Sequence, residues 1–327
     1  MQIELKGRKA IVTGSTAGIG RAIAEGLARA GASVVVNGRT KERVDTVLRE
    51  MRALLPQAEL SGVAADVATP EGCAALIAHT SNADILINNA GTARPNNFFD
   101  QTDQEWLDLF QLNVLSGVRL ARHYVPKMVA SGWGRVVFIS SESALNIPKE
   151  MIDYGVTKTA LLAVSRGLAE LVAGNGVTVN AVLPGPTDSE ILSNWMKSTA
   201  QEHGITPAQA EQDFLKTMRP TTLIHRFATT EEVANMVVYV ASEQASATTA
   251  ACGGLNQSIL RVHFYGSASY IGICSQAAWS QALPFLSSIT VSNRLSIDLS
   301  VSPTIPTTGL SARSCSKRSL YRSKRYG

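Results

Sequence analysis

A serine, a tyrosine and a lysine stand where they could act together on one oxygen atom. Tyr154 and Lys158 are four residues apart, so on a helix they share one face. Ser141 follows an apolar run that is typical of a buried strand. A free phenol, with a pKa of about 10, exchanges protons poorly at neutral pH unless a nearby cation favours the phenolate. With Lys158 as that cation, Tyr154 could pass a proton to or from a carbonyl or alcohol oxygen that Ser141 holds.

The Tyr-x-x-x-Lys spacing also occurs on exposed helices without any catalytic role, so the prediction needs a cofactor site. An apolar run at 9–13 leads into Gly14, Gly18 and Gly20, and a helical pattern follows up to Gly31. Glycines allow a tight turn beside a pyrophosphate, and the amino end of a helix offers N–H groups and a positive dipole. This GxxxGxG spacing differs from the commoner GxGxxG, and a helix that begins with incidental glycines would look the same.

The end of the second predicted strand, 33–37, bears on which dinucleotide is used. Arg39 follows that strand, close to where the adenosine ribose of a bound cofactor would lie. An acidic residue there would bind a 2′-hydroxyl, whereas an arginine pairs with a 2′-phosphate. Arg39 therefore favours NADP over NAD, although a solvated arginine at a helix start would carry no such meaning.

Further elements alternate at the spacing of β-α units. Helices are predicted at 42–55 and 70–78, and strands at 60–65, 84–88, 135–140 and 177–183. Asn113 lies inside a long amphipathic segment, 103–130, and two helical pieces at 190–226 resemble a cover over a site. This alternation predicts an α/β protein with a single Rossmann-type, doubly wound parallel sheet in three layers.

The chain resembles the short-chain dehydrogenase/reductase family over about 250 residues. The motifs that carry the resemblance are Gly14-x-x-x-Gly18-x-Gly20, Asp66, Asn88-Asn-Ala-Gly91, Asn113, Ser141, Tyr154-x-x-x-Lys158 and Pro184-Gly185. The resemblance implies a seven-stranded sheet, NAD or NADP as cofactor, and hydride transfer to or from a carbonyl or alcohol. It implies that Tyr154 is the acid/base, that Lys158 lowers its pKa and holds the nicotinamide ribose, that Ser141 orients substrate, and that Asn113 positions a proton-relaying water.

The cofactor residues predicted in this way form one set. They are Gly14, Ser15, Thr16, Gly18, Ile19, Gly20, Arg39, Asp66, Val67, Asn89, Ala90, Gly91, Tyr154, Lys158, Pro184, Gly185, Thr187 and Ser189. Relatives often place a threonine where this chain has Ser189, whose hydroxyl could still meet the carboxamide.

The sequence leaves more than one class of substrate open. Similar proteins that reduce 3-oxoacyl groups on an acyl-carrier protein tend to carry basic residues before the fifth and sixth strands, where this chain has Gly132-Trp133 and Asn175-Gly176. A small ketone, sugar, polyol or hydroxy-acid derivative is therefore favoured. A second hypothesis is a nucleotide-binding scaffold that an altered carboxyl end has impaired catalytically.

Composition argues against a secreted, membrane-spanning, metal-binding or disulfide-linked protein. The first nine residues carry charge where a signal peptide needs an apolar run, so a cytoplasmic, soluble enzyme is expected. Residues 263–293 lack charges, but Ser, Gln and Pro interrupt them too often for a membrane span. No Cys/His cluster indicates a metal site or a disulfide framework. By family likeness a dimer or tetramer is expected.

The likeness to the family ends near Thr249. Relatives usually have a glycine next and then a last strand, whereas this chain continues Ala250-Ala-Cys-Gly-Gly. Residues 250–327 hold 16 serines, eight basic residues and one acid, while 1–249 hold 22 Lys and Arg against 25 Asp and Glu. The net charge of +4 thus belongs to the tail, and it is no nucleic-acid footprint of the folded part.

We therefore expect a catalytic domain at 1–249 and a Ser-rich, disordered tail at 250–327, which we attribute to a shifted reading frame. This leaves open whether the usual last strand is present; without it the edge of the sixth strand would be unpaired.

Overall fold

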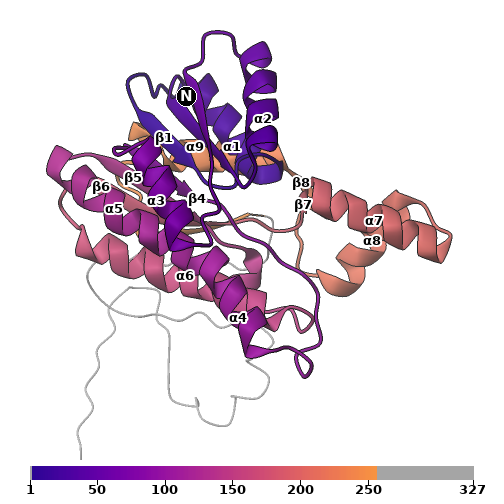
Figure 1. Ribbon diagram of the computed structural model, residues 1–327. Coiled ribbons are helices and arrows are strands. Elements are labelled where there is room, and N and C mark those ends of the chain that lie inside the picture. The colour runs from indigo at the N-terminus through magenta and orange to yellow at the C-terminus, as the bar shows by residue number, and fades with distance from the viewer. Residues whose placement is uncertain (1, 256–327) are drawn as a thin grey trace, which may run out of the picture. The chain divides into compact units, whose positions relative to one another are not determined.

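Seven parallel strands form the central sheet of the computed structural model, which describes residues 2–255 (Figure 1). Their spatial order is β3-β2-β1-β4-β5-β6-β9. The strands are β1 Lys9–Val12, β2 Ser33–Gly38, β3 Leu60–Ala64, β4 Ile85–Asn88, β5 Gly134–Ile139, β6 Val177–Leu183 and β9 Cys252–Gly254. The order reverses between β1 and β4, and ligands of such sheets bind outside the carboxyl ends of the strands at this point.

Both faces of the sheet are buried, which explains the continuous apolar runs of its strands. Ala10 and Val12 point into one hydrophobic cluster and Ile11 into the other. On the first face lie α1 Gly18–Arg29, α2 Lys41–Leu54 and α9 Thr230–Val240; on the second lie α3 Pro70–His79, α5 Ser116–Ser131 and α6 Ile152–Leu171. The expected three-layer, doubly wound sheet is therefore confirmed.

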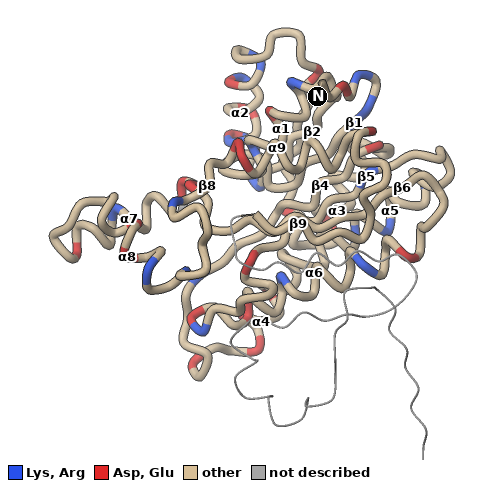
Figure 2. The backbone as a smooth tube through the Cα atoms, turned by 180° about the vertical axis from the view of Figure 1, so that it is seen from behind, with Lys and Arg blue, Asp and Glu red and all other residues tan. Residues whose placement is uncertain are grey.

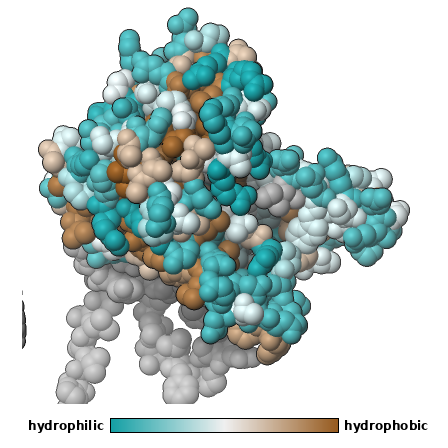
Figure 3. Space-filling model, in the orientation of Figure 1, coloured by the Kyte–Doolittle hydropathy of each residue, from teal (hydrophilic) through white to brown (hydrophobic). Residues whose placement is uncertain are grey.

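Two further helices form a separate lobe. α7 Glu190–His203 and α8 Pro207–Met218 stand apart from the sheet in both backbone views (Figures 1 and 2). They pack on each other through Met196, Phe214 and their neighbours. Strands β7 Thr187–Asp188 and β8 Ala228–Thr229 pair at the base of this lobe. Its visible surface is mostly hydrophilic (Figure 3), because its apolar side chains pack inside. These are the two helices predicted within 190–226.

The last strand, which the sequence left in doubt, is present. β9 pairs in parallel with the end of β6, from Ala181 opposite Cys252 to Leu183 opposite Gly254. The Ala181 N–H donates to the carbonyl of Ala251 at 2.9 Å, and the Leu255 N–H donates to the carbonyl of Leu183 at 3.0 Å. The edge of β6 is therefore covered here, and Cys252–Gly254 belong to the sheet.

The chain divides into units 1–264 and 265–327. Residues 256–327, on which the predictions of disorder and of a shifted frame rest, lie outside the described residues. Within residues 2–255, no helix is both long and apolar enough to cross a membrane.

Candidate active site

The glycine turn between β1 and α1 is packed against the end of β4. Gly14 has a φ of +61°, and a Cβ built on it would lie 3.0 Å from Cα of Ala90. A Cβ on Gly20 would overlap the Asn89 amide nitrogen and the Gly14 carbonyl oxygen. Neither position accepts a side chain, so the glycines are there because the backbone must pass this closely.

The amino end of α1 lacks a side-chain cap. Ala17 at its N-cap has no side-chain hydrogen bond, whereas a threonine or serine caps α2, α3, α4 (Asp103–Phe110), α7, α8 and α9. The first N–H groups of a helix have no partner within the helix. At α1 they are therefore available to an anion, which also meets the positive end of the helix dipole. The residues present thus fit the pyrophosphate of a dinucleotide.

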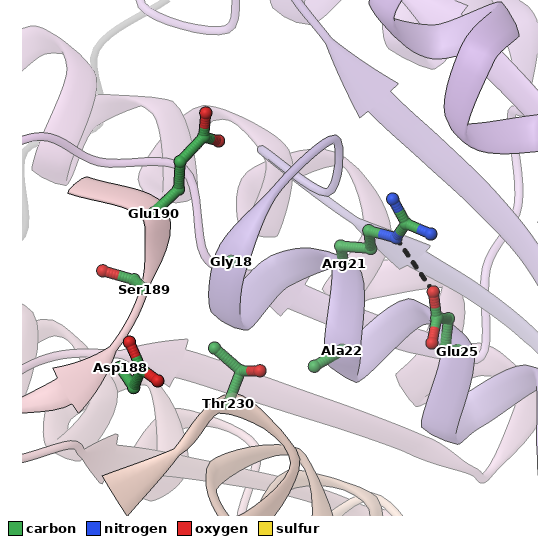
Figure 4. Close-up of a pocket in the computed structure, with 8 residues that line it drawn as sticks. All are labelled: Gly18, Arg21, Ala22, Glu25, Asp188, Ser189, Glu190 and Thr230. Carbon is green, nitrogen blue, oxygen red and sulfur yellow. Dashed lines mark hydrogen bonds and ion pairs between the residues drawn. The ribbon is translucent and has the colours of Figure 1, made fainter. Parts of the chain in front are cut away.

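A hollow of about 270 Å³ opens beside this helix end. Figure 4 shows it between Gly18 and Arg21 of α1, Asp188 and Ser189 at the start of the lobe, and Thr230 of α9. The side chain of Ser189 accepts a bond from the Leu192 N–H and caps α7. The lobe thus begins directly over the glycine turn.

Asn89 holds the ends of β1 and β4 together. Its side-chain nitrogen donates to the carbonyls of Thr13 at 2.9 Å and Gly14 at 3.1 Å. The Thr13 hydroxyl in turn accepts from the N–H groups of Asn89 and Ala90, each at 3.0 Å. This network fixes the glycine turn relative to the neighbouring strand.

Tyr154 and Lys158 come from the first turns of α6. Lys158 is buried, whereas Tyr154 is half-buried. Lys158 Nζ lies 5.5 Å from the centre of the Tyr154 ring and donates to the Ile139 carbonyl at 2.9 Å. The Ser140 hydroxyl holds the Lys158 carbonyl at 2.8 Å, so the end of β5 is tied to the helix. Ser141 comes next in the chain, and its hydroxyl interacts with the phenol.

The pKa of Tyr154 departs from our expectation. Burial raises it to about 12, although the interaction with Ser141 lowers it. Burial also lowers the pKa of Lys158 to about 8. The lowering of the phenol pKa by Lys158 is therefore not seen, because the low-dielectric surroundings disfavour the phenolate more than the neighbours favour it. The phenol is protonated at neutral pH, as a proton donor must be.

Asn113 lies next to this pair on a π-helical turn, Gln111–Leu115, between α4 and α5. Its side chain accepts from the Thr92 N–H at 2.9 Å and donates to the Thr92 carbonyl and the Thr157 hydroxyl, both at 3.0 Å. A Cβ placed on Gly91 would lie 3.2 Å from Asn113 Oδ1 and 3.4 Å from Lys158 Nζ. The structure therefore brings Asn113, Ser141, Tyr154 and Lys158 together.

The other predicted cofactor residues occupy different settings. Ser15 and Val67 are buried: the Ser15 hydroxyl donates to the Val12 carbonyl, and Val67 belongs to the hydrophobic core. The Thr187 hydroxyl donates to the Gly185 carbonyl, and Ile19 packs on the core. These side chains bond to the backbone or pack in the core, so they stabilise the segments that form the site. The exposed side chains of this set are Arg39, after β2, and Asp66, after β3.

Sequence reasoning missed a cluster of charges beside Ser141. Glu142 is 4% exposed, and its Oε1 lies 3.0 Å from Nε of Arg219, which follows α8. A second carboxylate, Glu150, lies 3.1 Å from the same guanidinium. A lone acid within the small-residue segment 140–144 was the signal that could have found it.

A buried aspartate before the tyrosine was missed as well. Asp153 is 3% exposed and accepts from Asn96 at 3.0 Å and from Gln101 at 2.6 Å. It also accepts from the Tyr154 N–H at 2.7 Å. Asp153 thereby fixes the first turn of α6 and the segment after β4 relative to each other.

Comparison with known proteins agrees with this geometry. Residues 8–200 match the family model described as short chain dehydrogenase. The chain is 42% identical over 263 residues to the uncharacterized oxidoreductase YvaG of Bacillus subtilis, covering 79% of this chain and all of that protein. It is 32% identical over 253 residues to 3-oxoacyl-[acyl-carrier-protein] reductase FabG of Aquifex aeolicus, covering 76% of this chain and 96% of that one.

A solved structure is also similar: L-sorbose reductase from Gluconobacter frateurii, complexed with NADPH and L-sorbose. It superposes with a TM-score of 0.75 at 32% identity and covers 80% of this chain and 100% of its own. This chain therefore belongs to the short-chain dehydrogenase family and is an NAD(P)-dependent oxidoreductase.

Proposed function

We propose that the protein is an NADPH-preferring carbonyl reductase in which Tyr154 donates the proton. The observation that carries this proposal is the position of the Tyr154 phenol beside Ser141 and the Lys158 ammonium. When bound at the glycine turn, the cofactor supplies the hydride, and negative charge develops on the carbonyl oxygen. Tyr154 passes its proton to that oxygen while Ser141 orients it. The Lys158 ammonium then returns a proton to the phenolate, and Asn113 positions the water that relays a proton to Lys158 in turn.

The preference for NADPH is supported by Arg39. It is exposed just beyond β2, where a 2′-phosphate would pair with its guanidinium, and β2 ends in Asn37-Gly38 without an acidic residue. The similarity to a reductase complexed with NADPH points the same way.

A 3-oxoacyl-acyl-carrier-protein reductase is the second candidate, favoured by the 32% identity to FabG. Near the amino end of β5 the basic residues Arg8 and Arg135 both pair with Glu243 and stack on Trp133, and Arg135 is buried. These arginines are used within the protein, so we favour a small carbonyl substrate. A scaffold without activity is the least favoured, because all four catalytic side chains are present and adjacent.

In the first test the purified chain is titrated with NADPH and with NADH, and the fluorescence of the bound cofactor measures each affinity. We expect NADPH to bind roughly tenfold or more tightly, and Arg39→Ala to remove the difference, since a charge-assisted bond contributes about 1.5–3 kcal/mol. Turnover is then measured with L-sorbose, simple ketones and a 3-oxoacyl thioester. Equal affinity for both cofactors would refute the preference, and binding without turnover of any carbonyl would refute the activity.

A further inference from the structure

Asp153 supplies the hydrogen-bond acceptor at the start of α6. Met151, at the N-cap position, makes no side-chain hydrogen bond, so the first N–H groups of α6 lack their usual acceptor. The carboxylate of Asp153, which is 3% exposed, accepts from the Tyr154 N–H at 2.7 Å. A carboxylate at this end of a helix also meets the positive end of the helix dipole. The backbone of the reacting tyrosine is therefore tied to a buried carboxylate.

Two amide side chains from the segment between β4 and α4 hold this carboxylate. Both oxygens of Asp153 accept from Asn96 Nδ2 at 3.0 Å, and Oδ2 also accepts from Gln101 Nε2 at 2.6 Å. Within residues 2–255 the hydrogen-bond partners of Asp153 are all neutral N–H groups, whose directions fix the carboxylate. The Asn96 N–H donates to the Glu150 carbonyl at 3.0 Å, so the backbone of the segment is anchored beside α6 as well.

The carbonyl side of Tyr154 is tied to the same segment. Its carbonyl accepts from the Thr157 hydroxyl at 2.7 Å, and that hydroxyl accepts from the Asn113 amide at 3.0 Å. Asn113 in turn bonds both backbone groups of Thr92. Two chains of hydrogen bonds thus run from the Tyr154 backbone to the segment after β4, one through Asn113 and one through Asp153.

We propose that Asp153 is a positioning residue for the proton transfer. Through the Tyr154 N–H it fixes where the phenol stands relative to Ser141 and Lys158, and it exchanges no proton itself. Misplacement of a reacting group by about 1 Å can lower a rate about 100-fold, so an anchor one bond away from the tyrosine backbone has a large effect on turnover. This inference rests on the proposed carbonyl reductase activity and adds a residue to the same site.

The experiment measures kcat and KM for the full chain with NADPH, with L-sorbose and cyclohexanone as the carbonyls. Asp153→Ala should lower kcat roughly ten- to hundredfold, because the first turn of α6 loses its anchor. The KM and the affinity for NADPH should stay within about threefold, since Asp153 bonds neither the glycine turn nor Lys158. Asp153→Asn keeps an oxygen for the Tyr154 N–H, so its kcat should stay within about fivefold of the wild type.

Asp84→Ala is the matched control. The Asp84 carboxylate also accepts from a backbone N–H, that of Lys9 at 2.8 Å, but at the amino end of β1. Its loss should leave kcat within threefold. Gln101→Met removes one donor to Asp153 and keeps the side-chain length, and should lower kcat about three- to tenfold. This variant decides if thermal melting shows that Asp153→Ala does not fold.

A double-mutant cycle separates positioning from general support of the fold. In a Tyr154→Phe background no phenol is left to place, so adding Asp153→Ala should lower the residual single-turnover rate less than about threefold. A further loss as large as that in the wild-type background would overturn the proposal. So would a fall in NADPH affinity equal to the fall in kcat, or an Asp153→Asn protein as slow as Asp153→Ala.

A signal that needs no substrate keeps this inference distinct from the proposed function. The chain holds seven tyrosines, and Tyr154→Phe identifies the ¹³Cζ resonance of Tyr154 in protein labelled at that carbon. Asp153→Ala should shift or broaden this resonance, whereas Asp84→Ala should not. An unchanged Tyr154 resonance refutes the positioning role whether or not any carbonyl is reduced. A wild-type chain that reduces no carbonyl while the resonance responds as expected refutes the carbonyl reductase alone.

Discussion

The reacting phenol is protonated at neutral pH, and burial favours that state further. The pKa of Tyr154 is raised to about 12, so at neutral pH its proton is present and can be donated. We expect Tyr154→Phe to lower the rate of ketone reduction roughly 10²- to 10⁴-fold, because no other group takes over the proton transfer, while NADPH still binds. Single-turnover oxidation of NADPH measures the rate. Tyr124→Phe is the control: that hydroxyl is buried too, but it bonds the Thr80 carbonyl away from the site, and its loss should leave the rate within threefold.

Lys158 provides a prediction about stability and pH. Its pKa is lowered by burial from 10.5 to about 8, so between these values the unfolded chain binds the proton more strongly. The free energy of unfolding should therefore rise with pH, by roughly 2 kcal/mol between pH 8 and 10. Above pH 10 the raised pKa of Tyr154 opposes this gain. Urea unfolding at several pH values should show the rise in the wild type and its loss in Lys158→Met; equal slopes for both proteins would contradict the assignment.

At the scale of elements, α1 is the helix whose start is shaped for a ligand. A methyl group on Gly20 would overlap the Asn89 amide and the Gly14 carbonyl, so Gly20→Ala must open the contact between β1 and β4. We expect it to weaken NADPH binding at least about tenfold and to cost roughly 1–3 kcal/mol of stability. Gly167→Ala in α6 meets no atom within 4 Å and should stabilise by about 0.5–1 kcal/mol. Calorimetric binding and thermal melting distinguish the two, and a Gly20→Ala protein that binds NADPH normally would refute the role of the turn.

The elements also show why part of the site could be predicted and part could not. Residues four apart on a helix, or at the end of a strand, are placed by local periodicity, so Tyr154, Lys158 and Ser141 could be grouped in advance. Arg219 comes to Glu142 from 77 positions away in the chain, through the path of the lobe. No local pattern encodes that contact. The π-helical turn at Asn113 was hidden for a similar reason, since its apolar pattern matches that of an ordinary helix.

For the whole molecule, the positions of the first six strands along the chain were predicted from the alternation of apolar runs and helices, whereas the position of the seventh was not. Cys252–Gly254 has neither the length nor the β-branched residues of a strand. Tertiary contacts hold it: the Asn180 side chain donates to the Thr248 carbonyl at 2.8 Å and accepts from the Ala251 N–H at 3.1 Å. The Asn180 side chain of β6 thus holds the neighbouring edge strand in place. In the sequence this position looks like any other residue of a buried strand.

The turn into that strand carries a strain that can be measured. Ala250 has a φ of +57°, in the left-handed region that favours glycine. This conformation costs an L-residue about 1–2 kcal/mol. A glycine would avoid that cost, but part of the stabilisation would be lost because glycine increases the entropy of the unfolded chain. We expect Ala250→Gly to stabilise the protein by roughly 0.5–1 kcal/mol in urea unfolding. Ala251→Gly, at a residue with an ordinary φ, should instead destabilise it by a similar amount, because only the entropic cost remains. If both variants lose stability equally, residue 250 is not left-handed and the pairing of β9 with β6 is wrong. If Ala250→Gly raises the free energy of unfolding and Ala251→Gly lowers it, the turn at residue 250 sets the pairing of the last strand.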